Sequence, residues 1–370
     1  MKVDPYDAGP PGATPGGRSA RPRRRMTGCA PRMRIRNRAA PGKGGECDVD
    51  RLKGRRFLVI GRVGMDLTAM PPGTRTCEAR EMMVSMGGSS ANIAAGLVKL
   101  GCSASLVTCV SDDAVGWYCE DQLEAYGIER RHVRRVKGEE RTSLALVEAR
   151  VEDHQSVIYR NNAADFCMSV ADVEAVDLTR FDAVITTGTV FAAEPSRAAA
   201  FRAFELARAA GLPVIFDVDY RPYSWPSPQI ASEVLSRAGD MADVIVGNDE
   251  EFGFMAGGIE RGFAHASALA QTSELVVYKM GPEGAVTFAN GEELRTGIYP
   301  VDALKPTGAG DSFMAGLIAG LAEGRRLREA VLRGSACASI VVAKPGCAPA
   351  MPDPAELKAF LDTHPGPTQG

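Results

Sequence analysis

Residues 304–321 read LKPTGAGDSFMAGLIAGL, a glycine-rich turn that runs directly into an apolar helix. Gly308 and Gly310 let successive backbone N–H groups converge, and a helix that begins near Asp311 adds the partial positive charge of its N-terminus. Together these features predict an anion hole. The segment lacks the third glycine of a dinucleotide-binding fingerprint and the G-K-[ST] of a P-loop, so it matches neither motif. An aspartate that only caps a helix after a glycine turn is the competing interpretation.

Short apolar runs alternate with helical stretches from Arg56 onward. Six runs have the near-continuous apolar character of strands that are buried on both faces. They cover residues 57–61, 104–110, 183–188, 213–218, 243–248 and 275–280. Between them lie helices such as 89–100, with apolar residues at i, i+4 and i+7, and 195–210, which Gly211 closes. This alternation predicts an α/β fold with a doubly wound, mainly parallel sheet.

Two stretches, 67–86 and 142–166, interrupt this alternation. The first lacks a helical period, and the second reads as two extended runs joined by a polar turn at 152–154. We expect both to form strands outside the main sheet, as a small β-lid over its carboxyl edge that excludes water from a site there. Since such a lid has free strand edges, a homodimer that pairs two lids would cover them.

The composition is that of a globular protein, with 370 residues of which 45% are hydrophobic and 24% charged. No run of about 18 apolar residues occurs, so we expect no membrane partner. Nine cysteines without a C-x-x-C pair, together with only four histidines, argue against a zinc site or a disulfide framework. They favour a reducing, cytoplasmic location.

Charge is unevenly distributed along the chain. Residues 1–53 hold thirteen Lys or Arg against five Asp or Glu, and the remainder holds 30 against 41. We therefore predict a disordered basic extension over 1–54, a folded domain over 55–362 and a flexible tail over 363–370. The acidic character of the folded part gives no support to a nucleic-acid partner.

A second glycine-rich segment, 86–101, reads MGGSSANIAAGLVKLG. Gly87 and Gly88 allow close backbone approach, and Asn92 in the first turns of the following helix could hydrogen-bond a polyhydroxy ligand. The alternative is a plain Gly-Gly turn with Ser89 as the helix cap.

Two strand ends carry further polar groups. The spacing Asn248-x-x-Glu251 suits contacts to the water shell of Mg²⁺, although the helix dipole alone would favour acids at that place. Lys279 closes a strand before a turn that contains Gly281 and Gly284, and a plain hairpin would explain that turn equally well.

Four motifs in this order resemble the PfkB-type, ribokinase-like carbohydrate kinases over residues 56–362. They are GGSSANIAAGLVKLG, Asn248-x-x-Glu251, the Lys279–Gly284 turn and TGAGDSFMAG. A narrower resemblance, to the 5-dehydro-2-deoxygluconokinase branch of inositol catabolism, is carried by four segments. These are PPGTR (71–75), SVIYRNNAADF (156–166), FDVDYRPYSW (216–225) and LKPTGAGDSF (304–313).

The resemblance implies ATP-dependent phosphorylation of a sugar-acid hydroxyl, with Mg²⁺. It assigns the chemical step to the base Asp311 and to the N–H donors of Gly308, Ala309 and Gly310. It assigns the hydroxyl-binding pocket to Asp66, at the end of the first strand, and to Gly87, Gly88 and Asn92. At least one of Arg160 and Arg221 would clamp the substrate carboxylate, since an arginine fork fits a carboxylate bidentately. For Arg221, the ATP phosphates compete as the target.

On the nucleotide side, the resemblance implies that Asn248 and Glu251 hold the water shell of Mg²⁺. It lines the nucleotide with Lys279, Gly281 and Gly284, and places residues 344–352, with Cys347, near the adenine.

The chain departs from the broader family at one point. Most members read D-T-x-G-A-G-D, and the first aspartate helps a loop that binds a monovalent cation; here Lys305 and Pro306 take the first two places. We expect Lys305 to supply a fixed positive charge and to weaken the need for K⁺.

Other functions remain open at this point. Within kinases they are 2-dehydro-3-deoxygluconate kinase, followed by ribokinase or fructokinase. From other classes they are a non-catalytic sugar or nucleotide sensor, which has no need of Asp311 as a base, and a Rossmann dehydrogenase. The dehydrogenase is disfavoured because GRVGMD (61–66) lacks the glycine spacing that it requires.

Overall fold

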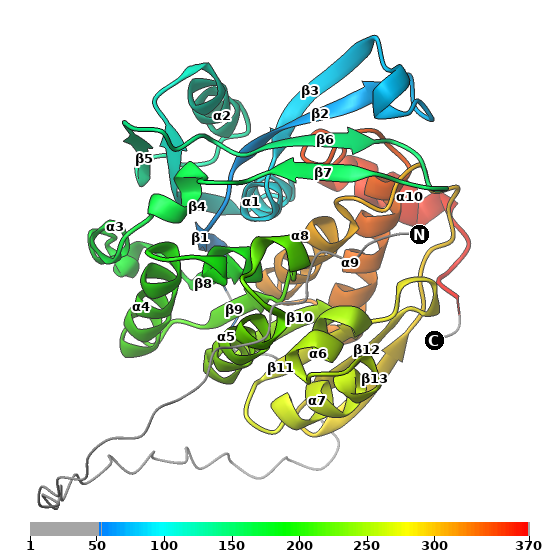
Figure 1. Cartoon of the computed structure of the whole chain (residues 1–370). Coiled ribbons are helices and arrows are strands. Elements are labelled where there is room, and N and C mark those ends of the chain that lie inside the picture. The colour runs from blue at the N-terminus through cyan, green and yellow to red at the C-terminus, as the bar shows by residue number, and fades with distance from the viewer. Residues whose placement is uncertain (1–51, 53, 369–370) are drawn as a thin grey trace, which may run out of the picture. The chain divides into compact units, whose positions relative to one another are not determined.

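A nine-stranded sheet forms the centre of the structure (Figure 1). The structure is a computed structural model that describes Leu52 and residues 54–368. Its strand order is β13-β12-β11-β10-β9-β8-β1-β4-β5. The strands are β1 (Arg56–Ile60), β4 (Ser103–Ser111), β5 (Val133–Val136), β8 (Ala183–Thr187), β9 (Val214–Asp217), β10 (Val244–Asn248), β11 (Leu275–Lys279), β12 (Ala285–Ala289) and β13 (Glu292–Thr296). Pairing is parallel from β5 to β11 and antiparallel for β11–β12 and β12–β13. The prediction of a doubly wound, mainly parallel sheet is confirmed.

All six strands predicted from the apolar runs are present, each within one residue of its expected bounds at either end. Three strands were not predicted: β5, β12 and β13. The sequence of β5 is VRRV, and its two arginines are exposed at the sheet edge. It therefore offers no apolar run to read.

Two helical layers cover the two faces of this sheet. One layer consists of α1 (Ser89–Lys99), α2 (Ala114–Ala125), α8 (Ala309–Ala322), α9 (Leu327–Val342) and α10 (Pro354–Thr363). The other consists of α3 (Val170–Glu174), α4 (Ser196–Ala209), α5 (Pro228–Met241), α6 (Asp249–Met255) and α7 (Gly262–Leu269). Alternate residues of β1 serve the two layers: Phe57 and Val59 enter one core, and Leu58 and Ile60 enter the other.

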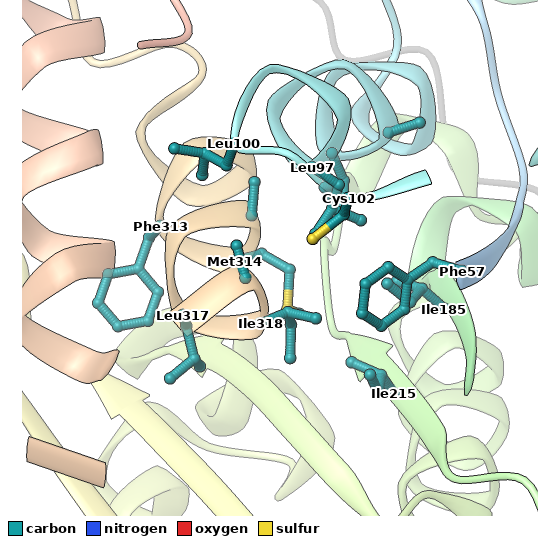
Figure 2. Packing of buried hydrophobic residues seen from close by; sticks show 14 of the residues in the cluster. Phe57, Leu97, Leu100, Cys102, Ile185, Ile215, Phe313, Met314, Leu317 and Ile318 are labelled. Carbon is teal, nitrogen blue, oxygen red and sulfur yellow. The ribbon is translucent and has the colours of Figure 1, made fainter. Parts of the chain in front are cut away.

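The helices α1 and α8 pack closely against each other over the sheet. Figure 2 shows Leu97 of α1 with Met314 and Ile318 of α8 in this apolar core. Gly96 makes the contact possible, because a Cβ at this position would lie 2.6 Å from the Cβ of Ala315. Each fully buried Leu, Ile or Met contributes about 1.5–3 kcal/mol. This packing holds the N-terminal turns of the two helices side by side.

A second, four-stranded sheet forms the predicted lid, seen at the top of Figure 1. Its order is β3-β2-β6-β7, and its strands are β2 (Gly64–Met70), β3 (Glu81–Gly87), β6 (Leu144–Glu148) and β7 (Ser156–Tyr159). The placement of Asp66 at the end of the first strand was wrong. Since β1 ends at Ile60 and Gly61 turns the chain with φ +141°, Asp66 is the third residue of the lid strand β2.

Short 3-10 turns join several of these elements: Thr76–Glu78, Ala164–Cys167, Leu178–Arg180, Gly188–Ala192, Pro222–Ser224, Ile259–Arg261 and Gly281–Glu283.

The expected disordered extension, 1–54, lies outside the described residues apart from Leu52 and Gly54. The expected tail follows α10, and within it Thr368 donates its backbone N–H to the carbonyl of Ile298 at 2.8 Å. Within the described residues, none of the helices has the length and apolar character needed to cross a membrane.

Candidate functional site

The loop before α8, where the sequence predicts an anion hole, turns at Gly308 into the start of the helix. Gly308 caps the helix with φ +86°, a left-handed conformation that favours glycine. A Cβ at Gly308 would lie 2.9 Å from Cys347 Sγ, so a larger residue does not fit. Ala309 and Gly310 follow in the first helical turn, where N–H groups have no partner inside the helix.

Asp311 lies half-buried in the first turn of α8. Burial, aided by the nearby charge of Asp219, raises the pKa of Asp311 to about 6. A hydrogen bond from Asn92 and the charges of Arg221 and Lys279 act in the opposite direction on this pKa. A carboxylate that titrates close to neutral pH is well suited to accept a proton.

Asn92 joins the second glycine-rich segment to this carboxylate. Its Nδ2 donates to Asp311 Oδ2 at 2.8 Å. Its Oδ1 is buried and, among the described residues, receives no hydrogen bond. Such an orphaned acceptor is costly unless a ligand supplies a donor, and a sugar hydroxyl is one.

Neither Gly87 nor Gly88 has room for a side chain. A Cβ at Gly87 would lie 1.9 Å from Asp66 Oδ1, and one at Gly88, where φ is +97°, would lie 2.5 Å from the carbonyl of Arg62. Both glycines are therefore required for the junction between β3 and α1 to pass close to residues 62–66. Asp66 is buried, and this burial raises its pKa against the opposing charges of Arg62 and Lys305.

Arg160 and Arg221 both lie near the site, with different partners. Arg160 forms a short ion pair with Asp165 and donates to the carbonyl of Thr189 at 3.0 Å. Arg221 pairs with Asp219 at 2.8 Å and donates to the carbonyl of Tyr220 at 3.1 Å.

Asn248 and Glu251 form a reciprocal cap at the start of α6. The backbone N–H of Asn248 donates to Glu251 Oε2, and that of Glu251 donates to Asn248 Oδ1, both at 2.8 Å. This cap explains the spacing of the two residues without any metal. Among residues 54–368, no cluster of three His, Cys, Asp or Glu side chains could hold a metal ion directly.

The residues expected on the nucleotide side come from three parts of the chain. Lys279 ends β11, and its Nζ lies 3.4 Å from the position of a Cβ on Gly310, beside the anion hole. Gly281 and Gly284 form the hairpin turn from β11 to β12, in which a Cβ at Gly284 would lie 2.0 Å from the carbonyl of Thr296. Cys347 is 3% exposed and packs behind Gly308.

Lys305 is buried beneath the anion hole. Its side chain is 1% exposed, and its Nζ donates to the carbonyls of Thr307 at 2.5 Å and Val341 at 3.2 Å. Burial lowers the pKa of Lys305, and Cys347, Asp311 and Asp66 oppose this shift. An ammonium group thus sits among backbone carbonyls close to Asp311.

Sequence reasoning did not single out several polar groups that the structure brings to this site. They are Arg62, Ser85, His154, Asp217 and Asp219. Asp217 ends β9, and Asp219 follows two residues later, both in the segment FDVDYRPYSW. Because ligands bind at the carboxyl ends of parallel strands, this position could have indicated both as site residues. Ser85 pairs in register with Asp66 and its hydroxyl is buried without a partner in the described residues. His154, in the lid turn, places its Nε2 3.4 Å from Thr307 Oγ1.

The pKa values of the two aspartates of this segment shift in opposite directions. Burial raises the pKa of Asp217 well above its usual value, and Lys279 only partly opposes this. Burial alone would also raise the pKa of Asp219, but Arg221, a hydrogen bond from Ser89 and the charges of Arg62 and Arg160 bring it below its usual value.

The folded part of the chain is similar to known carbohydrate kinases. The family model described as "pfkB family carbohydrate kinase" matches residues 55–354. The chain belongs to the pfkB family of carbohydrate kinases. A 5-dehydro-2-deoxygluconokinase of Photobacterium profundum is 35% identical over 313 residues, which cover 83% of this chain and 95% of that protein.

Solved structures of this family share the fold. A PfkB protein from Polaromonas sp. has a TM-score of 0.71 and 28% identity, and the match covers 83% of this chain and all of that one. A fructokinase double mutant from Vibrio cholerae, with fructose, ADP and a potassium ion bound, has a TM-score of 0.74 and 24% identity over 84% of this chain and 99% of that one. Ribokinase-like topology with a lid is thereby confirmed.

Proposed function

We propose that the protein phosphorylates a hydroxyl of a sugar acid with ATP, and that the acid is 5-dehydro-2-deoxygluconate, converted to its 6-phosphate. The observation that carries the proposal is Asp311, a half-buried carboxylate with a pKa of about 6 at the anion hole of α8. The 35% identity to a 5-dehydro-2-deoxygluconokinase supports the choice of sugar acid.

In the proposed reaction, the substrate hydroxyl attacks the γ-phosphorus of ATP and gives its proton to Asp311. A new O–P bond forms as the bond to the β-phosphate oxygen breaks, and ADP leaves. Negative charge on the transferred phosphoryl group is met by the N–H groups of Gly308, Ala309 and Gly310 and by Lys279. Because these groups are fixed before the reaction, they need no reorganisation as the charge develops.

The hydroxyl pocket consists of Asp66, Gly87, Gly88 and Asn92, as the resemblance implies. The unpaired Oδ1 of Asn92 supports this assignment, since a sugar hydroxyl would satisfy it. Ser85 joins the pocket, because it pairs with Asp66 across β2 and β3 and its buried hydroxyl has no hydrogen-bond partner within the described part of the chain.

The acidic groups near Lys279 fit Mg²⁺ bound through water. Asp217 and Glu251 are buried, and burial raises the pKa of each. A divalent cation nearby would relieve that cost, and Mg²⁺ keeps several waters that such carboxylates can contact. Glu251 and Asn248 would hold this water shell, and the ion would neutralise charge on the ATP phosphates.

We assign the nucleotide to the side of the site that Lys279, Gly281, Gly284 and Cys347 border. Cys347 would act from behind the anion hole, through its contact with Gly308. Lys305 would replace the monovalent cation, because its ammonium group already occupies the carbonyls of Thr307 and Val341.

The lid also supports a homodimer. Residues that pair in register point to the same face of a sheet, and the row Val84, Leu67, Leu146 and Val157 crosses all four lid strands. Val84 and Val157, on the two edge strands, are 48% and 47% exposed, and Tyr159 is 58% exposed. A second lid would cover this apolar row. The seven cysteines of the described residues are all free, which suits the proposed cytoplasmic location.

The test is release of ADP by the purified protein with four candidate acceptors: 5-dehydro-2-deoxygluconate, 2-dehydro-3-deoxygluconate, ribose and fructose. We expect the highest kcat/KM for 5-dehydro-2-deoxygluconate. A preference for 2-dehydro-3-deoxygluconate, ribose or fructose would replace the substrate assignment and keep the kinase. If none of the four acceptors causes release of ADP, but the protein binds a sugar or ATP, a non-catalytic sensor would be favoured.

A further inference from the structure

Arg62 is a buried guanidinium that forms no ion pair with a carboxylate among the described residues. It is 6% exposed and lies between the end of β1 and the start of β2. Among the described residues its side chain makes one hydrogen bond, from Nη1 to the hydroxyl of Ser143 at 3.1 Å. In the described part of the chain, it forms no ion pair within 4.0 Å. Burying a charge in this way is costly unless an opposite charge meets it.

The other two arginines of the site have such partners. Asp165 pairs with Arg160, and Asp219 pairs with Arg221 at 2.8 Å. The charges of all three guanidinium groups lower the pKa of Asp219. Of the three, only Arg62 has no carboxylate within 4.0 Å among the described residues, although its charge acts on Asp66 and Asp219 from farther away. The pocket therefore suits an anion.

The position of Arg62 selects the sugar rather than the nucleotide as the source of that anion. Its backbone carbonyl lies against Gly88. The neighbouring residue, Gly87, lies against the carboxylate of Asp66. Lys279, in contrast, lies beside Gly310 at the anion hole. Arg62 thus shares the side of the site that is assigned to sugar hydroxyls.

We infer that Arg62 binds the carboxylate of the substrate and so selects sugar acids over neutral sugars. This inference rests on the proposed function. Ser143, which directly precedes the lid strand β6, orients the guanidinium by accepting from its Nη1. The remaining N–H groups of the fork are then free to donate to a carboxylate bidentately.

The inference assigns different work to the two arginines singled out from the sequence. Arg160 is held by Asp165 and Thr189, and its ring contact with Phe166 at 4.1 Å fixes it further. Arg221 neutralises Asp219. Both therefore shape the pocket around the carboxylate, and Arg62 supplies the guanidinium that has no ion-pair partner among the described residues.

The test compares 5-dehydro-2-deoxygluconate with its carboxamide, which keeps the shape and removes the charge. For Arg62→Gln, we expect the ratio of kcat/KM for acid over amide to fall about 10- to 100-fold, the range of a charge-assisted hydrogen bond. Arg62→Lys keeps the charge and loses the forked guanidinium, so its ratio should lie between those of the wild type and Arg62→Gln. Arg333→Gln is the matched control, because Arg333 is 9% exposed and pairs with Glu323 away from the site. Its ratio should equal that of the wild type.

A second readout is independent of turnover. Without ATP, 5-dehydro-2-deoxygluconate should raise the Tm of the wild type and of Arg333→Gln, and raise that of Arg62→Gln much less. Arg62→Met removes the unpaired charge with little loss of volume, so its Tm without ligand should equal or exceed that of the wild type. This variant shows whether loss of selectivity comes from unfolding.

The outcomes separate the inference from the proposed function. If the wild type does not phosphorylate the acid, the proposed function fails, and the role of Arg62 falls with it. If the wild type uses the acid but Arg62→Gln slows acid and amide equally, the function stands and the inference is overturned. It is also overturned if Arg160→Gln or Arg221→Gln loses the preference for the acid and Arg62→Gln keeps it.

Discussion

Asn92 Nδ2 donates to Asp311 Oδ2 at 2.8 Å across 219 residues of sequence. The bond joins the first turns of α1 and α8, which pack together through Gly96 and Ala315. It places a neutral donor on the carboxylate that we assign as the base. Because the donor favours the ionised form, it holds the pKa of Asp311 below the value that burial alone would give.

Replacing Asp311 with asparagine removes the proposed base and keeps its shape. We expect kcat for Asp311→Asn to fall by about 10²–10⁴, the usual contribution of a general base. The Kd for ATP should change little, because the anion hole is built from backbone N–H groups. ADP release measures the first quantity and calorimetry the second. A variant that retains most of its activity would exclude Asp311 as the base.

The pH dependence of the reaction should report the same carboxylate. Burial raises the pKa of Asp311 to about 6. Below this value the group is protonated and cannot accept a proton, so kcat/KM should rise with pH and level off above about pH 7. The measurement is kcat/KM between pH 5 and 8, at constant ionic strength. A profile that is flat across this range would contradict the assignment.

The substitution Asn92→Ala tests the bond between the two residues. Without this donor the ionised form of Asp311 loses a stabilising contact, so its pKa should rise and the acidic limb of kcat/KM should move to higher pH. A residue that only filled space would lower activity without moving the limb. Ser90→Ala, on the same helical turn, serves as the control, since its hydroxyl bonds to the carbonyl of Ile60 and not to Asp311.

Most of the main sheet could be predicted from sequence because its strands are buried on both faces. An apolar run such as 275–280 needs no knowledge of its neighbours to be recognised as a strand. The edge strand β5 escaped prediction because Arg134 and Arg135 are exposed there. Asp66 was placed on the wrong strand because β1 and β2 are separated by only three residues.

The motif residues could be named from sequence, but their partners could not. Asp311 and Asn92 stand in glycine-rich segments whose spacing is informative. Arg160 has an ion-pair partner, and Arg62 has none among the described residues, because of which carboxylates the fold brings within 4.0 Å of each. Charge compensation is a property of tertiary structure, so no local pattern reveals it.

The position of Lys305 predicts how the enzyme responds to monovalent cations. Its Nζ donates to the carbonyls of Thr307 and Val341, which leaves these oxygens satisfied without an added ion. We expect the wild type to work at similar rates in K⁺ and in tetramethylammonium. In Lys305→Ala the carbonyls lose their donor, so activity should fall and K⁺ should partly restore it. A strict K⁺ requirement in the wild type would refute this role of Lys305.

The exposed row on the lid predicts the oligomeric state. If two lids pair, Val84→Lys places a charge among apolar side chains and should convert a dimer into a monomer. Tyr159→Lys should act in the same way from the opposite edge of the sheet. Ile259→Lys is the control, because Ile259 is 59% exposed on a 3-10 turn far along the chain from the lid strands. Sedimentation analysis of the three variants and the wild type measures the masses. A monomeric wild type, or a dimer that survives both lid substitutions, would show that the lid does not carry the interface.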